Sequence, residues 1–367
     1  MRMIMIGADP HKSQHTLVAV EAASGQLVGE LSVTSKPTGL RRLVDWARGL
    51  GAERVFAIED CRQVSGNLER FLVARGERVV RVAPKLMAGA RRAVREPGKS
   101  DPIDALAVAR ACLRGGPERL PAAFLDREAR DIKLLLDHRE DLEQEQTRIT
   151  NRLRWLLHDL WPELEIPRGA LSRFVWLDRL ARRLARAEQT ACVRIAREQV
   201  AQIRRLERRS RELERELTAL VKAKNPALLE LPGCGPLTAA KLLAETAGAE
   251  RFSSEAQLAR MAGVAPIPVS SGRSDRHRLD RGGNRQLNRA LHRIAFTQKR
   301  MLHEPACRYL ATKETEGKTP KEALRCLKRQ LVRTVLRQLR PPTPDGSDSQ
   351  AIRKKISSSR QRRLAAA

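Results

Sequence analysis

The chain is poor in aromatic residues, since Trp, Tyr and Phe together make up only 3% of its 367 residues and tyrosine occurs once. Proteins that hold single-stranded nucleic acid by stacking need a series of exposed rings. The composition therefore argues against base stacking as the main binding mode, and it favours contacts to phosphate wherever the partner is a nucleic acid.

Paired cysteines and long apolar runs are also missing. No two of the six cysteines form a Cys-x-x-Cys pair, so neither a zinc ribbon nor a disulfide framework is indicated. No apolar run approaches the roughly 20 residues of a membrane span, and the opening MRMIMIGADP is too short for a signal peptide. We expect a cytoplasmic, nucleoid-associated protein with reduced thiols and no membrane partner.

Negative charge is scarce relative to positive charge. The chain carries 43 Asp and Glu against 71 Lys and Arg, which gives a formal charge of +28 and an isoelectric point near 11.1. This excess exceeds what solubility requires, so a polyanionic partner is its simplest cause. The alternative is a basic protein without such a partner.

The first part of the chain predicts an α/β domain. Three strands in succession suggest an antiparallel meander, and helices and strands then alternate. This is the element order of an RNase H-like (RuvC-like) domain, with a mixed sheet flanked by helices. The predicted strands cover residues 4–10, 16–22, 26–33, 54–60 and 77–84, and the helices cover 38–50 and 66–76.

Leucines at helical spacing among dense Arg and Glu predict long helices from about residue 125 to 224. Breaks at Trp161-Pro162 and at Pro167 divide this region into two arms with a shorter helical piece between them. The arms are either a dimerising coiled coil or an intramolecular helical hairpin, because the heptads are imperfect.

A mainly α-helical unit follows, and the last stretch is rich in Pro, Ser and Arg, which is typical of disordered tails. The predicted divisions are an acidic domain over 1–124, a helical region over 125–226, a C-terminal domain over 227–340 and a basic tail over 341–367.

Four carboxylates stand where the predicted fold would bring them together. Asp9 ends the first strand, Glu59 closes the strand RVFAIED, and Asp101 and Asp104 lie on one face of a helix after Ser100. Clustered carboxylates need cations, and two Mg²⁺ ions are the ordinary solution for phosphodiester chemistry. Each residue has a structural alternative, as a helix cap or loop end, and Asp60 is the reserve candidate beside Glu59.

The segment LPGCGPLTAAKLLAE has the Pro-Gly-x-Gly pattern of a helix-hairpin-helix. Gly233 and Gly235 permit close approach of backbone N–H groups to a phosphate, and Thr238 and Lys241 add donors. The alternative is a tight turn without a ligand, in which Cys234 is a buried or turn thiol.

A polar loop with two serines precedes a helix that Asn284 is expected to begin, and Asn284 is also a candidate nucleic-acid contact. Ser270 and Ser271 stand among cations that can bind DNA and stabilise charge on a phosphate under attack by a hydroxyl. The surrounding residues are four arginines and one histidine, namely Arg273, Arg276, His277, Arg278 and Arg281. His277 is either a phosphate contact or a proton shuttle.

The GADPHK opening, the IED strand end, the KSDPIDALAVARA helix and the SG loop followed by RGGNRQLNRAL resemble one family. This is the IS110 group of bacterial insertion-sequence transposases, also called bridge-RNA-guided recombinases, although Pro10 stands where the family has a bulkier residue. The resemblance covers roughly residues 4–115 and 227–302.

The resemblance implies a DEDD metal site at Asp9, Glu59, Asp101 and Asp104, and a loop serine that becomes linked to DNA phosphate. We favour Ser271, which precedes Gly272, over Ser270. It also implies donor and target DNA as partners, a structured noncoding guide RNA, and a homodimer that assembles into a tetramer. The competing functions are a hydrolytic nuclease of the Holliday-junction type and an architectural nucleic-acid-binding protein, which would gain nothing from four clustered carboxylates.

Overall fold

The computed structural model of the chain describes residues 3–59, 64–82, 86–87, 100–120, 122–123, 126–249, 251–252, 254–269, 277–280 and 282–340. The expected disordered tail, Asp60 and most of the serine loop lie outside these residues, the latter including Ser270, Ser271, Arg273, Arg276 and Arg281.

The N-terminal domain is built on a five-stranded mixed sheet with the order β3-β2-β1-β4-β5. Strand β2 runs antiparallel to β1 and β3, while β4 pairs in parallel with β1 and with β5. The predicted meander followed by parallel strands is thus confirmed, and with it the RNase H-like order. The strands are β1 (Met3–Pro10), β2 (Gln14–Glu21), β3 (Leu27–Thr34), β4 (Glu53–Glu59) and β5 (Val79–Val82).

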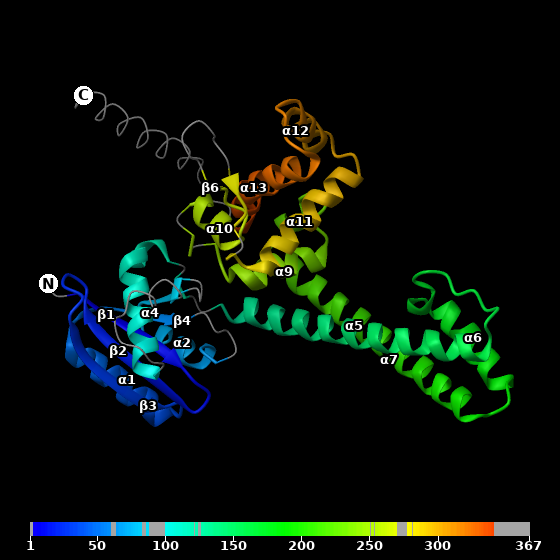
Figure 1. Cartoon of the computed structure of the whole chain (residues 1–367), viewed down its shortest axis with the longest axis horizontal. Helices are drawn as coiled ribbons and strands as arrows, with labels where there is room; N and C mark the ends of the chain where they lie inside the picture. The colour runs from blue at the N-terminus through cyan, green and yellow to red at the C-terminus, as the bar shows by residue number, and fades with distance from the viewer. Residues whose placement is uncertain are drawn as a thin grey trace.

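Helices cover both faces of this sheet (Figure 1). Helices α1 (Pro37–Leu50) and α2 (Gly66–Val73) pack on one face, and α4 (Asp101–Gly115) packs on the other. Side chains alternate along β1, so that Ile4 and Ile6 join the core under α1 while Met5 joins the core under α4. Two apolar layers therefore hold the sheet.

The long helices form a hairpin within one chain. Helices α5 (Arg127–Leu160) and α7 (Ala191–Lys224) pack side by side and extend away from the rest of the molecule, with α6 (Phe174–Arg186) at the far end (Figure 1). The far end has its own small core, which contains Leu153, Leu177 and Leu184. Of the two alternatives, the intramolecular hairpin is seen directly, and dimerisation stays a prediction.

The C-terminal unit is mainly helical, as expected. Its elements are α8 (Ala227–Glu230), α9 (Pro236–Thr246), α10 (Glu255–Met261), β6 (Ile267–Pro268), β7 (His277–Arg278), α11 (Arg285–Arg300), α12 (Glu304–Thr315) and α13 (Pro320–Leu339). One-turn helices lie at Pro117–Arg119 and Ala170–Ser172.

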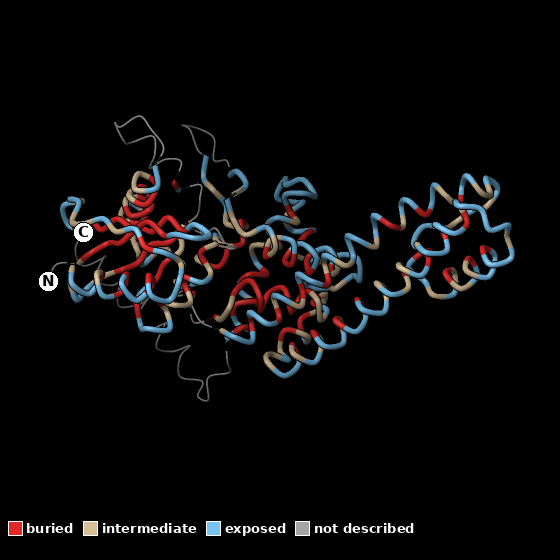
Figure 2. The backbone as a smooth tube through the Cα atoms, turned by 90° about the horizontal axis from the view of Figure 1, so that it is seen from below, coloured by how far each residue is buried: buried red, intermediate tan, exposed pale blue. Residues whose placement is uncertain are grey.

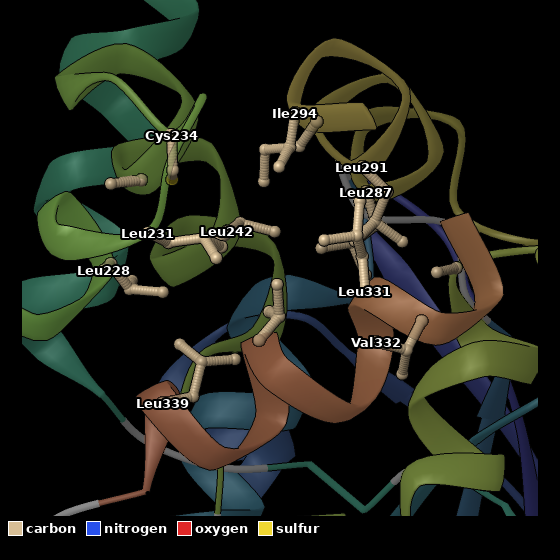
Figure 3. Close-up of a cluster of buried hydrophobic side chains, with 14 of the residues drawn as sticks. Leu228, Leu231, Cys234, Leu242, Leu287, Leu291, Ile294, Leu331, Val332 and Leu339 are labelled. Atoms are coloured by element: carbon tan, nitrogen blue, oxygen red, sulfur yellow. The ribbon is translucent and has the colours of Figure 1, made fainter. Parts of the chain in front are cut away.

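The root of the hairpin belongs to the core of this C-terminal unit. Figure 3 shows part of this core, in which Leu242 of α9, Leu291 of α11 and Leu331 of α13 lie. Ile132 and Leu136 of α5 and Leu217 and Val221 of α7 are buried in the same cluster. Figure 2 shows buried residues concentrated in the N-terminal domain and in the C-terminal unit. The hairpin arm that extends beyond them is mostly exposed. The predicted boundary near residue 226 therefore falls where the two regions share one core.

Among the helices of the described residues, none is long and apolar enough to span a membrane.

Candidate active site

The ends of two neighbouring strands bring Asp9 and Glu59 to the same edge and the same face of the sheet. Strands β1 and β4 run parallel with Ala8 opposite Ile58, so the next residues along each strand stand side by side. Met5 of β1 and Val55 and Ala57 of β4 face α4. Because side chains alternate along a strand, Asp9 and Glu59 face α4 as well.

Helix α4 supplies the other two carboxylates from its first turn. It begins at Asp101, and Ser100 is its N-cap as expected, although the Ser100 side chain makes no capping hydrogen bond. Asp104 is only 6% exposed, whereas Asp101 is exposed. The first turn of α4 thus offers one inner and one outer carboxylate on the face directed at β1.

Gly7 determines how closely α4 approaches the sheet. A Cβ atom at Gly7 would lie 2.1 Å from the carbonyl oxygen of Ala105 and 2.5 Å from the backbone nitrogen of Ala109. No side chain fits there, so glycine is required for α4 to lie directly on β1. This contact holds the start of α4 beside Asp9, and sequence analysis missed it.

His11 lies between two of the carboxylates. Its Nε2 atom is 3.2 Å from Oδ2 of Asp9 and 3.4 Å from Oδ1 of Asp101. One ligand atom from each of these three residues lies within 4.8 Å of the others, a spacing that fits a shared metal ion. His11 was not among the predicted site residues, although its place in the GADPHK motif, two residues after Asp9, was an available signal.

The electrostatics of Asp9 are those of a carboxylate in a crowded acidic site. Burial raises its pKa above the usual value, His11 acts in the opposite direction, and the charges of Asp104 and Asp101 raise it further. A bound cation would offset both the desolvation of Asp9 and its repulsion by the neighbouring carboxylates.

The serine loop is described only at its ends. Strands β6 and β7 pair antiparallel, with Ile267 opposite Arg278 and Pro268 opposite His277, so the two ends of the loop are held together. His277 and Arg278 are exposed. The loop serines themselves lie outside the described residues.

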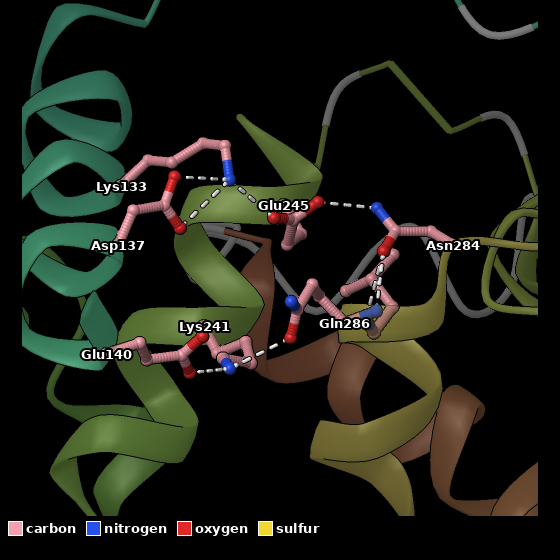
Figure 4. Close-up of polar contacts among 8 residues, drawn as sticks. Lys133, Asp137, Glu140, Lys241, Glu245, Asn284 and Gln286 are labelled. Atoms are coloured by element: carbon pink, nitrogen blue, oxygen red, sulfur yellow. Dashed lines mark hydrogen bonds and ion pairs between the residues drawn. The ribbon is translucent and has the colours of Figure 1, made fainter. Parts of the chain in front are cut away.

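Asn284 begins α11, as predicted, and its side chain is used within the fold. Its Oδ1 accepts hydrogen bonds from the backbone N–H groups of Gln286 and Leu287, and its Nδ2 donates to Glu245 over 2.5 Å. Glu245 in turn accepts a 2.8 Å hydrogen bond from Lys133 of α5 (Figure 4). The helix that follows the serine loop is therefore tied to α9 and α5.

Gly283 before α11 and Asn288 within it fasten the same region to the segment after α10. A Cβ atom at Gly283 would lie 2.2 Å from the backbone nitrogen of Gly263. Asn288 donates to the carbonyl oxygens of Ala262 and Gly263 at 3.0 and 3.1 Å. The backbone contact explains why this turn needs glycine at position 283.

The expected phosphate-binding hairpin packs inward. Gly233 has a φ of +82°, and a Cβ atom there would lie 3.0 Å from the carbonyl oxygen of Ile294 on α11. Thr238 and Lys241 are 6% and 7% exposed, and the Lys241 ammonium contacts Glu140 and Gln286 (Figure 4). Phosphate contact by these side chains stays a prediction that their burial does not favour.

Helix α8 before this hairpin has a single turn, so the helix-hairpin-helix also stays a prediction. Gly235 is the N-cap of α9 and has open space where a Cβ would lie. Cys234 is a buried thiol, as one reading of the sequence proposed, and burial raises its pKa to about 12.

Comparison with known proteins agrees with this arrangement. A model of DEDD transposases of the IS110 type matches residues 6–162, and a model described as the transposase IS116/IS110/IS902 family matches residues 225–310. The chain is also similar to T. thermophilus RuvC, solved in complex with a Holliday junction substrate. That likeness covers 34% of this chain and 99% of RuvC, with 18% identity and a TM-score of 0.26. The fold assignment rests on the strand order instead.

Two Streptomyces proteins encoded by insertion elements align with most of the chain. The IS110 protein of Streptomyces coelicolor is 31% identical over 67% of this chain and 71% of its own length. The IS116 protein of Streptomyces clavuligerus is 28% identical over 92% of this chain and 94% of its own length. These relatives agree with the two family models, one of which matches the N-terminal part and the other the C-terminal part. The chain belongs to the IS110 family of DEDD transposases, enzymes that break and rejoin DNA.

Proposed function

We propose that this transposase cleaves and rejoins DNA strands through a phosphoserine intermediate, with Ser271 as the nucleophile and Ser270 as its alternative. The observation that carries the DNA-cleaving part is the acidic edge of the sheet, where ligand atoms of Asp9, His11 and Asp101 lie within 4.8 Å of one another. Asp9 and Glu59 share a face of the sheet, and α4 brings Asp101 and Asp104 to it. The serine part is supported by the family's loop motif and by the β6–β7 pairing that holds the loop ends together.

In the proposed step, Oγ of Ser271 forms a bond to the scissile phosphorus while the bond from phosphorus to one DNA oxygen breaks. The serine proton passes to a base, and the leaving oxygen takes a proton and departs as a free hydroxyl. Rejoining reverses these changes with a hydroxyl of another strand, so the energy of the phosphodiester bond is conserved and no nucleotide is needed.

The chain's own residues supply position and charge. Asp9, Glu59, Asp101 and Asp104 form an all-oxygen donor set that fits Mg²⁺ or a pair of such ions. When bound, the cation would neutralise charge on the phosphate oxygens. His277 and Arg278 are exposed beside the loop and suit a phosphate contact.

A structured noncoding RNA that guides target choice is part of this proposal, as is assembly of the chain into a dimer and then a tetramer. Support for the RNA comes from the family resemblance together with the charge of +28, which fits two nucleic-acid partners. Sequencing of RNA that copurifies with the full chain tests this part, since an element-derived structured RNA should be enriched.

The decisive experiment is a search for a covalent protein–DNA adduct on denaturing gels. Wild-type protein with Mg²⁺ should form an adduct that survives SDS and is destroyed by protease. Ser271→Ala should lose the adduct and all recombination while keeping DNA affinity, because only a hydroxyl is removed. EDTA, or Asp9→Asn, should abolish the adduct as well.

Ser270→Ala is the matched control, because it removes the same hydroxyl one residue away. If Ser270→Ala loses the adduct and Ser271→Ala keeps it, the nucleophile is Ser270 and the mechanism stands. If active wild-type protein forms no adduct and its product ends carry oxygen from water, the serine mechanism fails and hydrolysis by the carboxylate site replaces it.

A further inference from the structure

Helix α11 carries a one-sided row of cations. Its sequence, RQLNRALHRIAFTQKR, contains five Lys and Arg and no Asp or Glu. The buried face consists of Leu287, Ala290, Leu291, Ile294, Ala295 and Gln298. Because an α-helix turns by about 100° per residue, the positions of the basic residues all fall on the opposite face. This basic face consists of Arg285, Arg289, Arg293, Lys299 and Arg300.

The charge on this face is not neutralised by the protein. All five side chains belong to exposed residues, and none of them forms an ion pair with a carboxylate of the described residues. Many other cations of the chain do form such pairs, for example Arg139 with Glu143 and Glu214. An exposed row of five unpaired cations costs electrostatic repulsion in the free protein, and a polyanion would relieve it.

A cavity of about 440 Å³ lies beside the basic face, between α11, α9 and the two long helices. Arg289 and Arg293 line it together with Arg139 and Lys241. Its three carboxylates already contact cations within the cavity, since Glu140 contacts Lys241 and both Glu143 and Glu214 contact Arg139. The positive charges of Arg289 and Arg293 are therefore not balanced by the carboxylates that line the cavity.

An aromatic pair lies on the same side of α11. The rings of His292 and Phe296 are stacked with centroids 6.2 Å apart, and Phe296 is 53% exposed. A flat, partly apolar surface among arginines suits the sugar or base edges of a strand whose phosphates are held by the cations.

We infer that the basic face of α11 is a docking surface for duplex DNA next to the scissile phosphate. This inference rests on the proposed function, because α11 is the next element after β7, the described end of the serine loop, and Asn284 fixes its first turn. From Arg285 to Arg300 the helix extends roughly 22 Å, the length of several base-pair steps. DNA is the occupant because the attacked strand must continue past the loop, and α11 is the next element.

The test compares two double variants of the full chain in binding to a labelled random-sequence DNA duplex. Arg289→Gln with Arg293→Gln removes two charges from the basic face. Arg182→Gln with Arg186→Gln is the matched control, because it removes two exposed arginines at the same spacing from α6, at the far end of the hairpin. All four substitutions are at exposed residues, and thermal melting checks that the variants fold.

We expect the α11 variant to bind duplex DNA about 100-fold more weakly at low salt, since each charge-assisted contact is worth on the order of tenfold. Its slope of log K against log salt should be less steep by about 2. The control variant should stay close to wild type in both measurements.

Three results would overturn the inference: unchanged duplex affinity, an equal loss in the control variant, or a loss confined to an RNA stem-loop of the same length. The last result would make RNA the occupant. None of these depends on cleavage, so the inference can fail while the wild-type adduct still forms, and the adduct can be absent while α11 still binds DNA.

Discussion

Asp9 illustrates how one residue can be unfavourable for folding and necessary for chemistry. It is 7% exposed, and burial together with the nearby Asp104 and Asp101 raises its pKa in spite of His11. These surroundings disfavour the charged form of the Asp9 carboxylate. Residues of this kind are typical of active sites, where stability is given up for a reactive arrangement.

We therefore predict that Asp9→Asn stabilises the metal-free protein at pH 7. A raised pKa in the folded state means that folded protein holds the proton more tightly, so stability is lost as pH rises through that pKa. Asparagine avoids the loss, and the melting temperature should rise by on the order of a few degrees. The gain should disappear below about pH 4, where the aspartate is protonated in both states.

The same melting temperatures, measured with Mg²⁺ present, test whether Asp9 binds the metal. Added Mg²⁺ should raise the melting temperature of the wild type and have much less effect on Asp9→Asn. Glu30→Gln, an exposed carboxylate on β3, is the control and should change neither value appreciably. If Asp9→Asn were destabilised at pH 7, the account of an electrostatically costly Asp9 would be wrong.

Among the elements, helices α5, α9 and α11 are joined by a small polar network. Burial alone would lower the pKa of the Lys133 ammonium, but hydrogen bonds and charges from Glu245 and Asp137 outweigh burial and raise it. Glu245 is 7% exposed and also holds Asn284 at the start of α11 (Figure 4). The network thus connects the hairpin arm to the start of α11, the helix that follows the serine loop along the chain.

Glu245→Gln should weaken this connection. The amide keeps the shape of the side chain but removes the negative charge facing Lys133, which leaves a partly buried cation less well paired. We expect a loss of about 1–3 kcal/mol in the free energy of unfolding. We also expect slower adduct formation at saturating DNA, because the loop end is held less firmly.

Asp137→Asn is the matched control for this variant. It removes the other carboxylate that contacts Lys133, but its side chain is 50% exposed and it leaves the bond between Glu245 and Asn284 in place. An exposed pair of this kind contributes at most about 1 kcal/mol. Equal effects on adduct formation from the two variants, in denaturant-unfolding and single-turnover measurements, would argue against a positioning role for Glu245.

At the scale of the whole molecule, positive charge is the main source of the expected affinity for nucleic acid. The formal charge of +28 accompanies a low aromatic content, so affinity for nucleic acid should come from phosphate contacts and the release of condensed counterions. One group of these charges lies on α11, the helix that follows β7 along the chain, and others lie on the long helices of the hairpin arm.

Affinity should consequently fall steeply with salt. We expect log K for DNA to decrease with log salt with a slope on the order of −5 or steeper, which corresponds to at least about six phosphate contacts. Fluorescence anisotropy at a fixed Mg²⁺ concentration measures this slope. A nearly flat titration would remove the electrostatic account of binding, whatever the cleavage assays show.

Much of the fold could be predicted from the sequence because local patterns determine it. Alternation of apolar residues identified the strands around Asp9 and Glu59, Ser100 identified the start of α4, and Pro162 identified the end of the first long helix. The same local signals placed the four carboxylates at strand ends and on one helix face. Residue type and spacing along the chain carry this information.

Contacts between distant segments could not be predicted in this way. The fit of Gly7 against Ala105, the approach of His11 to Asp101, and the bond from Glu245 to Asn284 join residues that no short pattern relates. The same holds for Lys241, which a motif assigned to phosphate and the packing of α5 assigned to Glu140. The sequence by itself determined the elements, the charge and the candidate chemistry. Tertiary structure alone decided which donors remain free for a ligand, because burial and pairing depend on which helices pack together.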